Sequence, residues 1–315
     1  MLLDTPWTLI FDDGLDGVVV LDPNDPIGES SRVKGQRPGD QPYRLEFVDG
    51  HLIVGWEEIY AVDIASGEST LIGEATIFVP AAESDRAWLI DYSGGRIGSG
   101  GLQVWQVSVF GEVLTTPVEI ETSGFPAIGI PGGLAIESDS GISILDPARG
   151  SVVELGSGAS FISDVTVGRG SALAWCSDPC DEFHVTELIS DVDQVFSHPG
   201  QRLRFVARSA RFSGDGRYLA APTESGDVVV FDRETGRAYV AFGTPDSRPA
   251  SIRWPPSGLE LFASVSSQDG LSTTLAYHRL GTGRPETFQV SLTLGSTFVV
   301  VTEDEARSFL AASTG

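Results

Sequence analysis

Hydrophobic and polar residues form a recurring pattern in this chain, and its clearest copy is GDVVVFDRETGRAYVAFG, from Gly226 to Gly243. Two short apolar runs flank a polar turn, which predicts two antiparallel strands. The first run, Val228 to Phe231, is continuously apolar instead of alternating, as expected of a strand that is buried on both faces. Sheets stacked against each other would bury it in this way.

Six further stretches repeat this arrangement: GVVVLDPNDP, EIYAVDIASGESTLIG, LQVWQVSVFGEVLTTPV, GISILDPARGSVVEL, EFHVTELISDVDQVF and TTLAYHRLGTGRPETFQV. In chain order, the first apolar run of each of the seven units ends at Asp22, Asp63, Val109, Asp146, Leu188, Asp232 and Leu280, so neighbouring units lie 37 to 48 residues apart. A strand-rich period of about 40–50 residues is typical of a β-propeller, in which each repeat forms one four-stranded blade.

The segments between these units supply the remaining strands. YRLEFVDGHLIVGW, for example, predicts two strands around the turn dipeptide Asp49-Gly50. We name the four strands of a blade a to d, so that each repeated unit provides c and d. The first period has no strand a, whereas STFVVVTED near the C-terminus is an unassigned strand. Because unpaired strand edges promote aggregation, we expect Ser296–Thr302 to complete the first blade.

The fold predicted for residues 1–315 is therefore a single all-β domain, a seven-bladed β-propeller closed by its C-terminal strand. Only TEDEARSFLAAS, after that strand, predicts a helical turn or two.

Residues 211–236, RFSGDGRYLAAPTESGDVVVFDRETG, resemble the repeat of WD-repeat and TolB-like propellers. The resemblance implies an interaction scaffold of a bacterial type. The chain has no Trp-Asp dipeptide and no Gly-His pair, so the side-chain network of true WD repeats is not expected.

Charge excludes several classes of partner. The net charge is −24, and Lys34 is the only lysine, whereas nucleic-acid binding requires clustered basic residues. An anionic membrane surface is disfavoured for the same reason, and an acidic surface favours a soluble monomer or reflects a high-salt habitat. No apolar run is long enough for a transmembrane helix, and the first residues lack the pattern of a signal peptide.

Two cysteines, Cys176 and Cys180, stand in AWCSDPCDEF between predicted strands b and c of the fifth blade. A disulfide that closes this loop, two free thiols, and a metal or redox role are all open, although zinc needs four ligands. A disulfide would favour an extracytoplasmic location, with a tethering segment outside this chain, and a cytoplasmic location is the alternative.

Acidic residues end most of the predicted b strands. Because all b–c loops of a propeller share one face, we expect a binding face there, with Trp56 close to it, although such residues are also common turn formers. The candidate residues are Asp12, Asp13, Trp56, Glu57, Glu58, Asp91, Glu137, Asp139, Asp178 and Glu224.

No residue set points to catalysis. His51, His184, His198 and His278 fall in different periods, and the Gly-rich stretch 92–103 precedes a strand, whereas a phosphate-binding loop precedes a helix. The tryptophans are expected to pack between blades.

The leading hypothesis is a non-enzymatic module that binds a protein, peptide or ligand, without a cofactor. A Ca²⁺-dependent hydrolase of the lactonase type, with its site in the channel, is the alternative, and a cofactor-dependent oxidoreductase is a third.

Overall fold

The computed structural model describes residues 5–12, 17–24, 31–34, 44–83, 85–92, 101–120, 127–138, 141–146, 151–155, 160–166, 170–190, 192–197, 204–243, 251–266, 273–281, 286–290 and 298–313. The chain divides into two compact units, one of Met1–Ser123 with Leu292–Gly315 and one of Gly124–Ser291.

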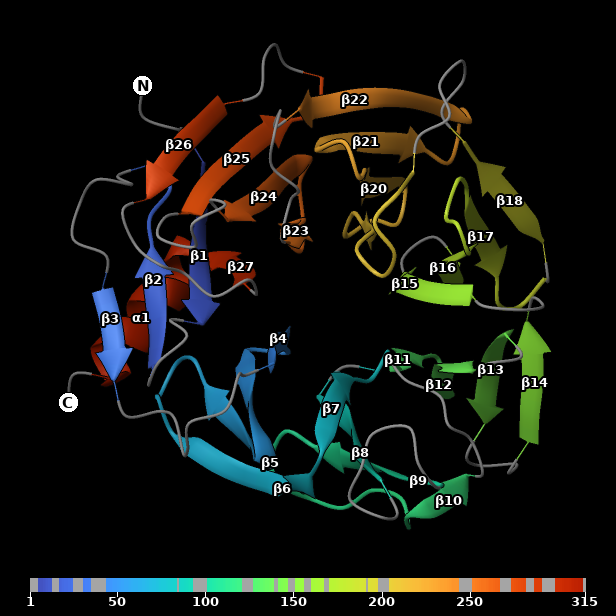
Figure 1. Cartoon of the computed structure of the whole chain (residues 1–315). Helices are drawn as coiled ribbons and strands as arrows, with labels where there is room; N and C mark the ends of the chain where they lie inside the picture. Colours follow the sequence, from blue (N-terminus) through green and yellow to red (C-terminus); the bar gives the residue numbers. More distant parts are fainter. Residues whose placement is uncertain are drawn as a thin grey trace. The chain divides into compact units, whose positions relative to one another are not determined.

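The first unit contains three antiparallel sheets (Figure 1). One sheet has the order β27 (Phe298–Thr302), β1 (Trp7–Asp12), β2 (Gly17–Leu21), β3 (Ser31–Lys34). The next consists of β4 (Arg44–Val48), β5 (His51–Asp63) and β6 (Ser69–Ala75). The third consists of β7 (Ile77–Pro80), β8 (Arg86–Tyr92), β9 (Leu102–Ser108) and β10 (Val118–Ile120).

Strand β5 contains the predicted strands b and c of the second blade. Its residues 51–55 pair with β4, and its residues 57–62 pair with β6. Between them, a Cβ placed on Gly55 would lie 2.1 Å from the carbonyl oxygen of Glu58, and Glu57 has a φ of 67°. The chain therefore turns back at Gly55–Glu58, where the b–c turn was predicted.

The first blade is built from both ends of the chain, as predicted. β27 pairs antiparallel with β1, with a register that runs from Trp7 opposite Thr302 to Phe11 opposite Phe298. The rings of Phe11 and Phe298 stack with their centroids 4.9 Å apart. Phe298 is fully buried, so the C-terminal strand contributes to the core as well as to the sheet.

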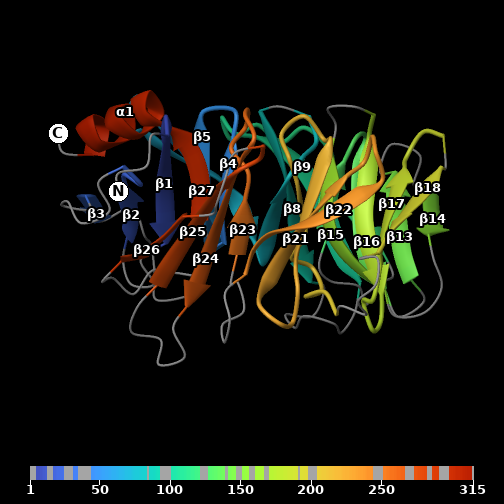
Figure 2. The same cartoon turned by 90° about the horizontal axis from the view of Figure 1, so that it is seen from above.

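Helix α1 (Glu303–Ser313) follows β27 and contacts the first sheet (Figure 2). It is longer than the helical turn or two that the sequence predicted. Its start is capped reciprocally, because the Thr302 amide donates to the Glu305 carboxylate at 2.7 Å and the Glu305 amide donates to Thr302 Oγ1 at 3.2 Å. Phe309 is fully buried against the strands.

The second unit contains four antiparallel sheets of four strands, each in sequential order. The first two are β11 (Ala127–Ile130), β12 (Gly133–Ser138), β13 (Gly141–Asp146), β14 (Ser151–Leu155), and β15 (Ser160–Thr166), β16 (Ala172–Ser177), β17 (Phe183–Glu187), β18 (Asp193–Phe196). The last two are β19 (Arg211–Phe212), β20 (Tyr218–Pro222), β21 (Asp227–Asp232), β22 (Arg237–Gly243), and β23 (Ser251–Arg253), β24 (Glu260–Ser266), β25 (Thr273–Arg279), β26 (Glu286–Val290).

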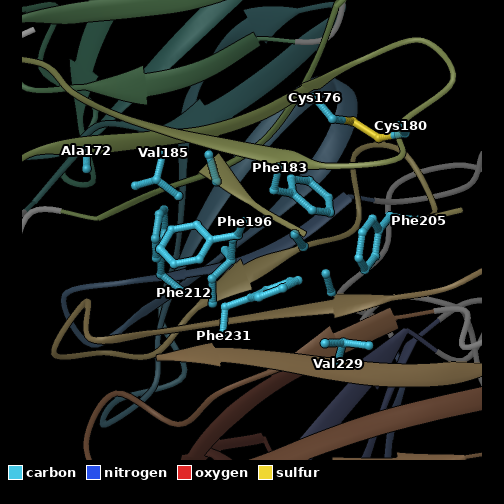
Figure 3. Packing of buried hydrophobic residues seen from close by; sticks show 14 residues of the cluster. Ala172, Cys176, Cys180, Phe183, Val185, Phe196, Phe205, Phe212, Val229 and Phe231 are labelled. Carbon is cyan, nitrogen blue, oxygen red and sulfur yellow. A yellow bond between two sulfur atoms is a disulfide. The ribbon is translucent and has the colours of Figure 1, made fainter. Parts of the chain in front are cut away.

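Apolar side chains fill the space between successive sheets within this unit. Figure 3 shows Phe183 and Phe196 of one sheet facing Phe212 and Phe231 of the next, with Phe205 from the intervening loop. In β21, the side chains from Val228 to Phe231 are all buried, which confirms that this strand is covered on both faces. Together the seven sheets make the chain a seven-bladed β-propeller that is closed by its C-terminal strand.

Candidate functional site: the b–c ends of the blades

In the first unit, the predicted binding residues lie at or near the ends of b strands. Glu57 and Glu58 are exposed at the turn within β5, and the Glu58 carboxylate accepts a hydrogen bond from the Tyr60 hydroxyl at 3.0 Å. Asp91, near the end of β8, is half-buried and accepts a hydrogen bond from Thr76 Oγ1 at 2.5 Å. Asp12 ends β1 and Trp56 lies in the turn of β5, whereas Asp13 is outside the described residues.

In the second unit, Asp178 and Glu224 are exposed in b–c loops, and Asp139 is outside the described residues. Glu137 is different, because it lies in β12 with only 4% of its surface exposed. Its carboxylate accepts a hydrogen bond from the Ile162 amide at 2.7 Å and two from Arg208, from Nε at 3.0 Å and from Nη2 at 2.7 Å. This carboxylate therefore links two blades, and both of its oxygens already accept hydrogen bonds from groups of the protein.

Burial has the largest effect on the pKa of Glu137 and raises it, while the hydrogen bonds from Arg208 and from the Ile162 amide oppose the rise. Arg208 has a φ of 63°, which is uncommon for a residue with a side chain. Its guanidinium carbon lies 4.7 Å from the centre of the Phe161 ring. The Arg208 side chain is 46% exposed, so it links the buried carboxylate to the surface.

Arg208 belongs to a short segment, Arg204 to Ser209, that we call the arginine loop. The Phe205 amide donates to the carbonyl of Cys180 at 3.0 Å, and the Val206 amide donates to the carbonyl of Pro222 at 2.8 Å. The Glu224 amide in turn donates to the carbonyl of Arg204 at 2.8 Å. The loop thus joins the b–c ends of the fifth and sixth blades. The ion pair of Arg208 with Glu137 attaches the b–c end of the fourth blade to them.

A disulfide fixes the b–c loop of the fifth blade. Cys176 and Cys180 are bonded, with their Cα atoms 5.2 Å apart, and both are buried (Figure 3). This confirms the first of the three alternatives for the cysteines. Three residues after Cys180, the Phe183 ring packs on the Phe205 ring of the arginine loop, with centroids 5.2 Å apart. This contact connects the disulfide-bonded loop to the arginine loop.

A second ionic group near the arginine loop was also missed by the sequence analysis. Arg211 Nη1 donates to the carbonyl of Ser163 at 2.7 Å, and the Asp164 carboxylate accepts the Phe212 amide at 2.7 Å. Burial raises the pKa of Asp164, and the charge of Arg211 opposes this. The available signal was the sequence RFVARSARF, which gathers three of the chain's 20 basic residues.

One described histidine lies in a polar network within a single blade. His184 belongs to a network inside the fifth blade, where its Nδ1 lies 2.7 Å from an oxygen of Asp193. Trp175 Nε1 donates to Thr186 Oγ1 at 2.9 Å, and that hydroxyl donates to Asp193 at 3.0 Å. The Trp175 and His184 rings stack 4.3 Å apart. This arrangement connects three strands, and no motif in the sequence had indicated it.

The described residues contain neither a candidate metal cluster nor a candidate membrane-spanning helix. Within that part of the chain, no three His, Cys, Asp or Glu side chains come together in a group that could hold a metal ion. The same part of the chain has no helix of the length and apolar character needed to cross a membrane. His198 lies outside the described residues.

No family model and no curated protein matches this sequence. Solved structures do match the fold. AztD from Citrobacter koseri, in its apo structure, aligns with a TM-score of 0.58 and 13% identity over 94% of this chain and 97% of its own. The Cps50 (Swd1) β-propeller domain of Myceliophteria thermophila aligns with a TM-score of 0.56 and 14% identity over 83% and 90%. Hsv2p of Kluyveromyces lactis aligns with a TM-score of 0.55 and 15% identity over 77% and 76%. At these identities, the matches support the propeller fold alone.

Proposed function

We propose that this propeller is a non-enzymatic binding module that holds a protein or peptide partner at the b–c ends of its blades. The observation that carries this proposal is the arginine loop. Its hydrogen bonds to Cys180, Pro222 and Glu224 and its ion pair with Glu137 join three b–c ends into one surface. A surface held in one conformation loses little conformational entropy when a partner binds.

The charges exposed at individual b–c ends indicate a partner with basic groups. Asp178 and Glu224 are exposed in the second unit, and Glu57 and Glu58 in the first. The chain as a whole carries a net charge of −24, which attracts cationic partners and speeds their association. Because Glu137 is paired with Arg208, we do not count it among the partner-binding carboxylates.

The test compares two charge-neutralised variants of the full chain. One carries Asp178→Asn and Glu224→Gln at the b–c ends, and its control carries Glu234→Gln and Asp304→Asn, which are exposed at a c–d turn and in α1. Both variants change the net charge equally. Binding is measured on an array of peptides that range from acidic to basic.

We expect basic peptides to bind the wild-type chain, and their binding to weaken with added salt. The b–c variant should lose much of this binding while the control keeps it. Equal losses in both variants would mean that only net charge matters, and that result, or an array on which nothing binds, would refute the proposal.

The disulfide also supports a proposed location outside the cytoplasm, because such bonds form and persist in oxidising compartments. We further propose that residues 1–315 act as a single domain, since the first blade needs both ends of the chain. A single cooperative unfolding transition in calorimetry would support this, and two separate transitions would contradict it.

A further inference from the structure

Exposed apolar side chains gather in the first unit around the loop between β9 and β10. Phe110 and Val113 are each 65% exposed, Leu114 is 38% exposed, and Leu71 in β6 is 46% exposed. A Cβ placed on Gly111 would lie 3.2 Å from the carbonyl oxygen of Leu71, so the tip of the loop packs on β6. We call Leu71, Phe110, Val113 and Leu114 the Phe110 patch.

The loop that presents this patch is held firmly. The Gly111 amide donates to the carbonyl of Ser108 at 3.0 Å, and the Leu114 amide donates to the carbonyl of Gln106 at 2.8 Å. Val109, between them, is buried in the core. The backbone is therefore fixed while the apolar side chains at the tip stay in solvent, although burying them would be favourable.

The surroundings of the patch are acidic. Glu112 is exposed within the loop, and Glu68 and Glu74 are exposed beside and within β6. Among the described residues between 44 and 120, the only arginines are Arg44 and Arg86, and there is no lysine. Arg86 Nε already lies 3.4 Å from a carboxylate oxygen of Asp85. Negative charge around the patch is thus largely unbalanced.

We propose that the Phe110 patch binds a protein segment that carries an apolar side chain flanked by lysine or arginine. An aromatic anchor surrounded by a polar rim is the common form of an interaction hot spot, and the carboxylates here complement basic flanking residues. A second copy of this chain would bring the same carboxylates together, and an anionic membrane would be repelled. Charge therefore selects a basic partner segment.

This surface differs from the one under the proposed function and does not depend on it. The Phe110 ring packs edge-on against His51, with centroids 5.4 Å apart, and His51 begins β5. The b–c turn at Gly55–Glu58 lies at the other end of that hairpin. The two surfaces can therefore be inactivated separately.

The experiment measures fluorescence anisotropy of three labelled peptides titrated with the full chain. The first has a phenylalanine or leucine between lysines, the second replaces the lysines with glutamates, and the third replaces the apolar residue with serine. We expect the first to bind more tightly than either of the others, because attraction of basic peptides to the b–c ends does not require an apolar residue. Phe110→Ser should weaken it about tenfold or more, as loss of a central anchor does, whereas Phe110→Leu should retain most of the binding.

Three further variants make the result specific. Ile189→Ser removes another exposed apolar side chain, 88% exposed in the second unit, and should leave binding unchanged. Glu234→Gln should also bind normally, because this residue is exposed at a c–d turn of the second unit and belongs to neither proposed surface. Glu112→Gln should weaken binding and reduce its dependence on salt.

Several outcomes would overturn the proposal. If the glutamate or serine peptide binds as tightly as the first peptide, or if none of the three binds, a basic segment with an apolar residue is not the ligand of this patch. Unchanged affinity in Phe110→Ser would remove the patch as the site. A concentration-dependent dimer in sedimentation, lost in Phe110→Ser, would make a second copy of the chain the occupant instead.

Discussion

Replacing Phe298 by alanine tests whether the C-terminal strand stabilises the whole protein. The Phe298 side chain is fully buried and its ring stacks on Phe11. Truncating a buried phenylalanine to alanine costs about 3–5 kcal/mol, from lost transfer free energy and from the cavity that remains. The β27–β1 backbone pairing is left intact, so the cost measures the packing of this strand.

The expected shift in melting temperature follows from the length of the chain. At ~2.1 cal/mol/K of unfolding entropy per residue, the 315 residues give an unfolding entropy of about 0.66 kcal/mol/K. A loss of about 3–5 kcal/mol then lowers the melting temperature by about 5–8 °C if the chain unfolds as one domain. Differential scanning calorimetry measures the shift, and circular dichroism verifies that both proteins start folded.

Phe110→Ala is the matched control, because it makes the same chemical change at a side chain that is 65% exposed. A surface substitution of this kind changes the free energy of unfolding by about 0.5 kcal/mol or less, which corresponds to under ~1 °C. If Phe298→Ala melts no lower than Phe110→Ala, the C-terminal strand does not support the fold, and the argument for closure through β27 fails.

Two other predictions concern the second unit. Replacing Cys176 and Cys180 by serine should lower the free energy of unfolding by about 2 kcal/mol, because the disulfide no longer restricts the unfolded chain. Chemical denaturation measures this loss. A mass of the native protein that shows two free thiols would contradict the disulfide itself. Burial lowers the pKa of His278 in the folded protein below its ordinary value of 6.5. The folded protein therefore resists protonation of this residue more than the unfolded chain does. The corresponding stability is fully present above the unfolded pKa and is lost as the pH falls through the lowered folded pKa. His278→Phe should therefore show a smaller drop in melting temperature between about pH 7.5 and pH 5 than the wild type, and identical pH profiles would refute this.

The sequence predicted the blades well because their signal is local. Apolar runs such as Val228 to Phe231 and turn dipeptides such as Asp49-Gly50 determine strands within a few residues. The missing first strand could be assigned to the C-terminus because a propeller leaves no place for an unpaired edge. The assignment of strands to blades could therefore be predicted from the number of strands in each repeat.

The candidate site was less accessible from sequence, since its contacts are distant along the chain. Glu137 was expected at the surface, but Arg208, 71 residues away, pairs with it and lets it be buried. The exposure of Phe110 was hidden for a similar reason. Within its repeated unit it reads as one more apolar residue, and only the fold of the loop turns it outward.

The pairing of β27 with β1 also sets the order of events during protein synthesis. β1 (Trp7–Asp12) leaves the ribosome about 290 residues before its partner, β27 (Phe298–Thr302). At about 5–20 residues per second, the edge of β1 stays open for tens of seconds while the other blades form. A newly made chain thus carries an unpaired strand edge until β27 has been made, and that interval is when a chaperone would be of most use to it.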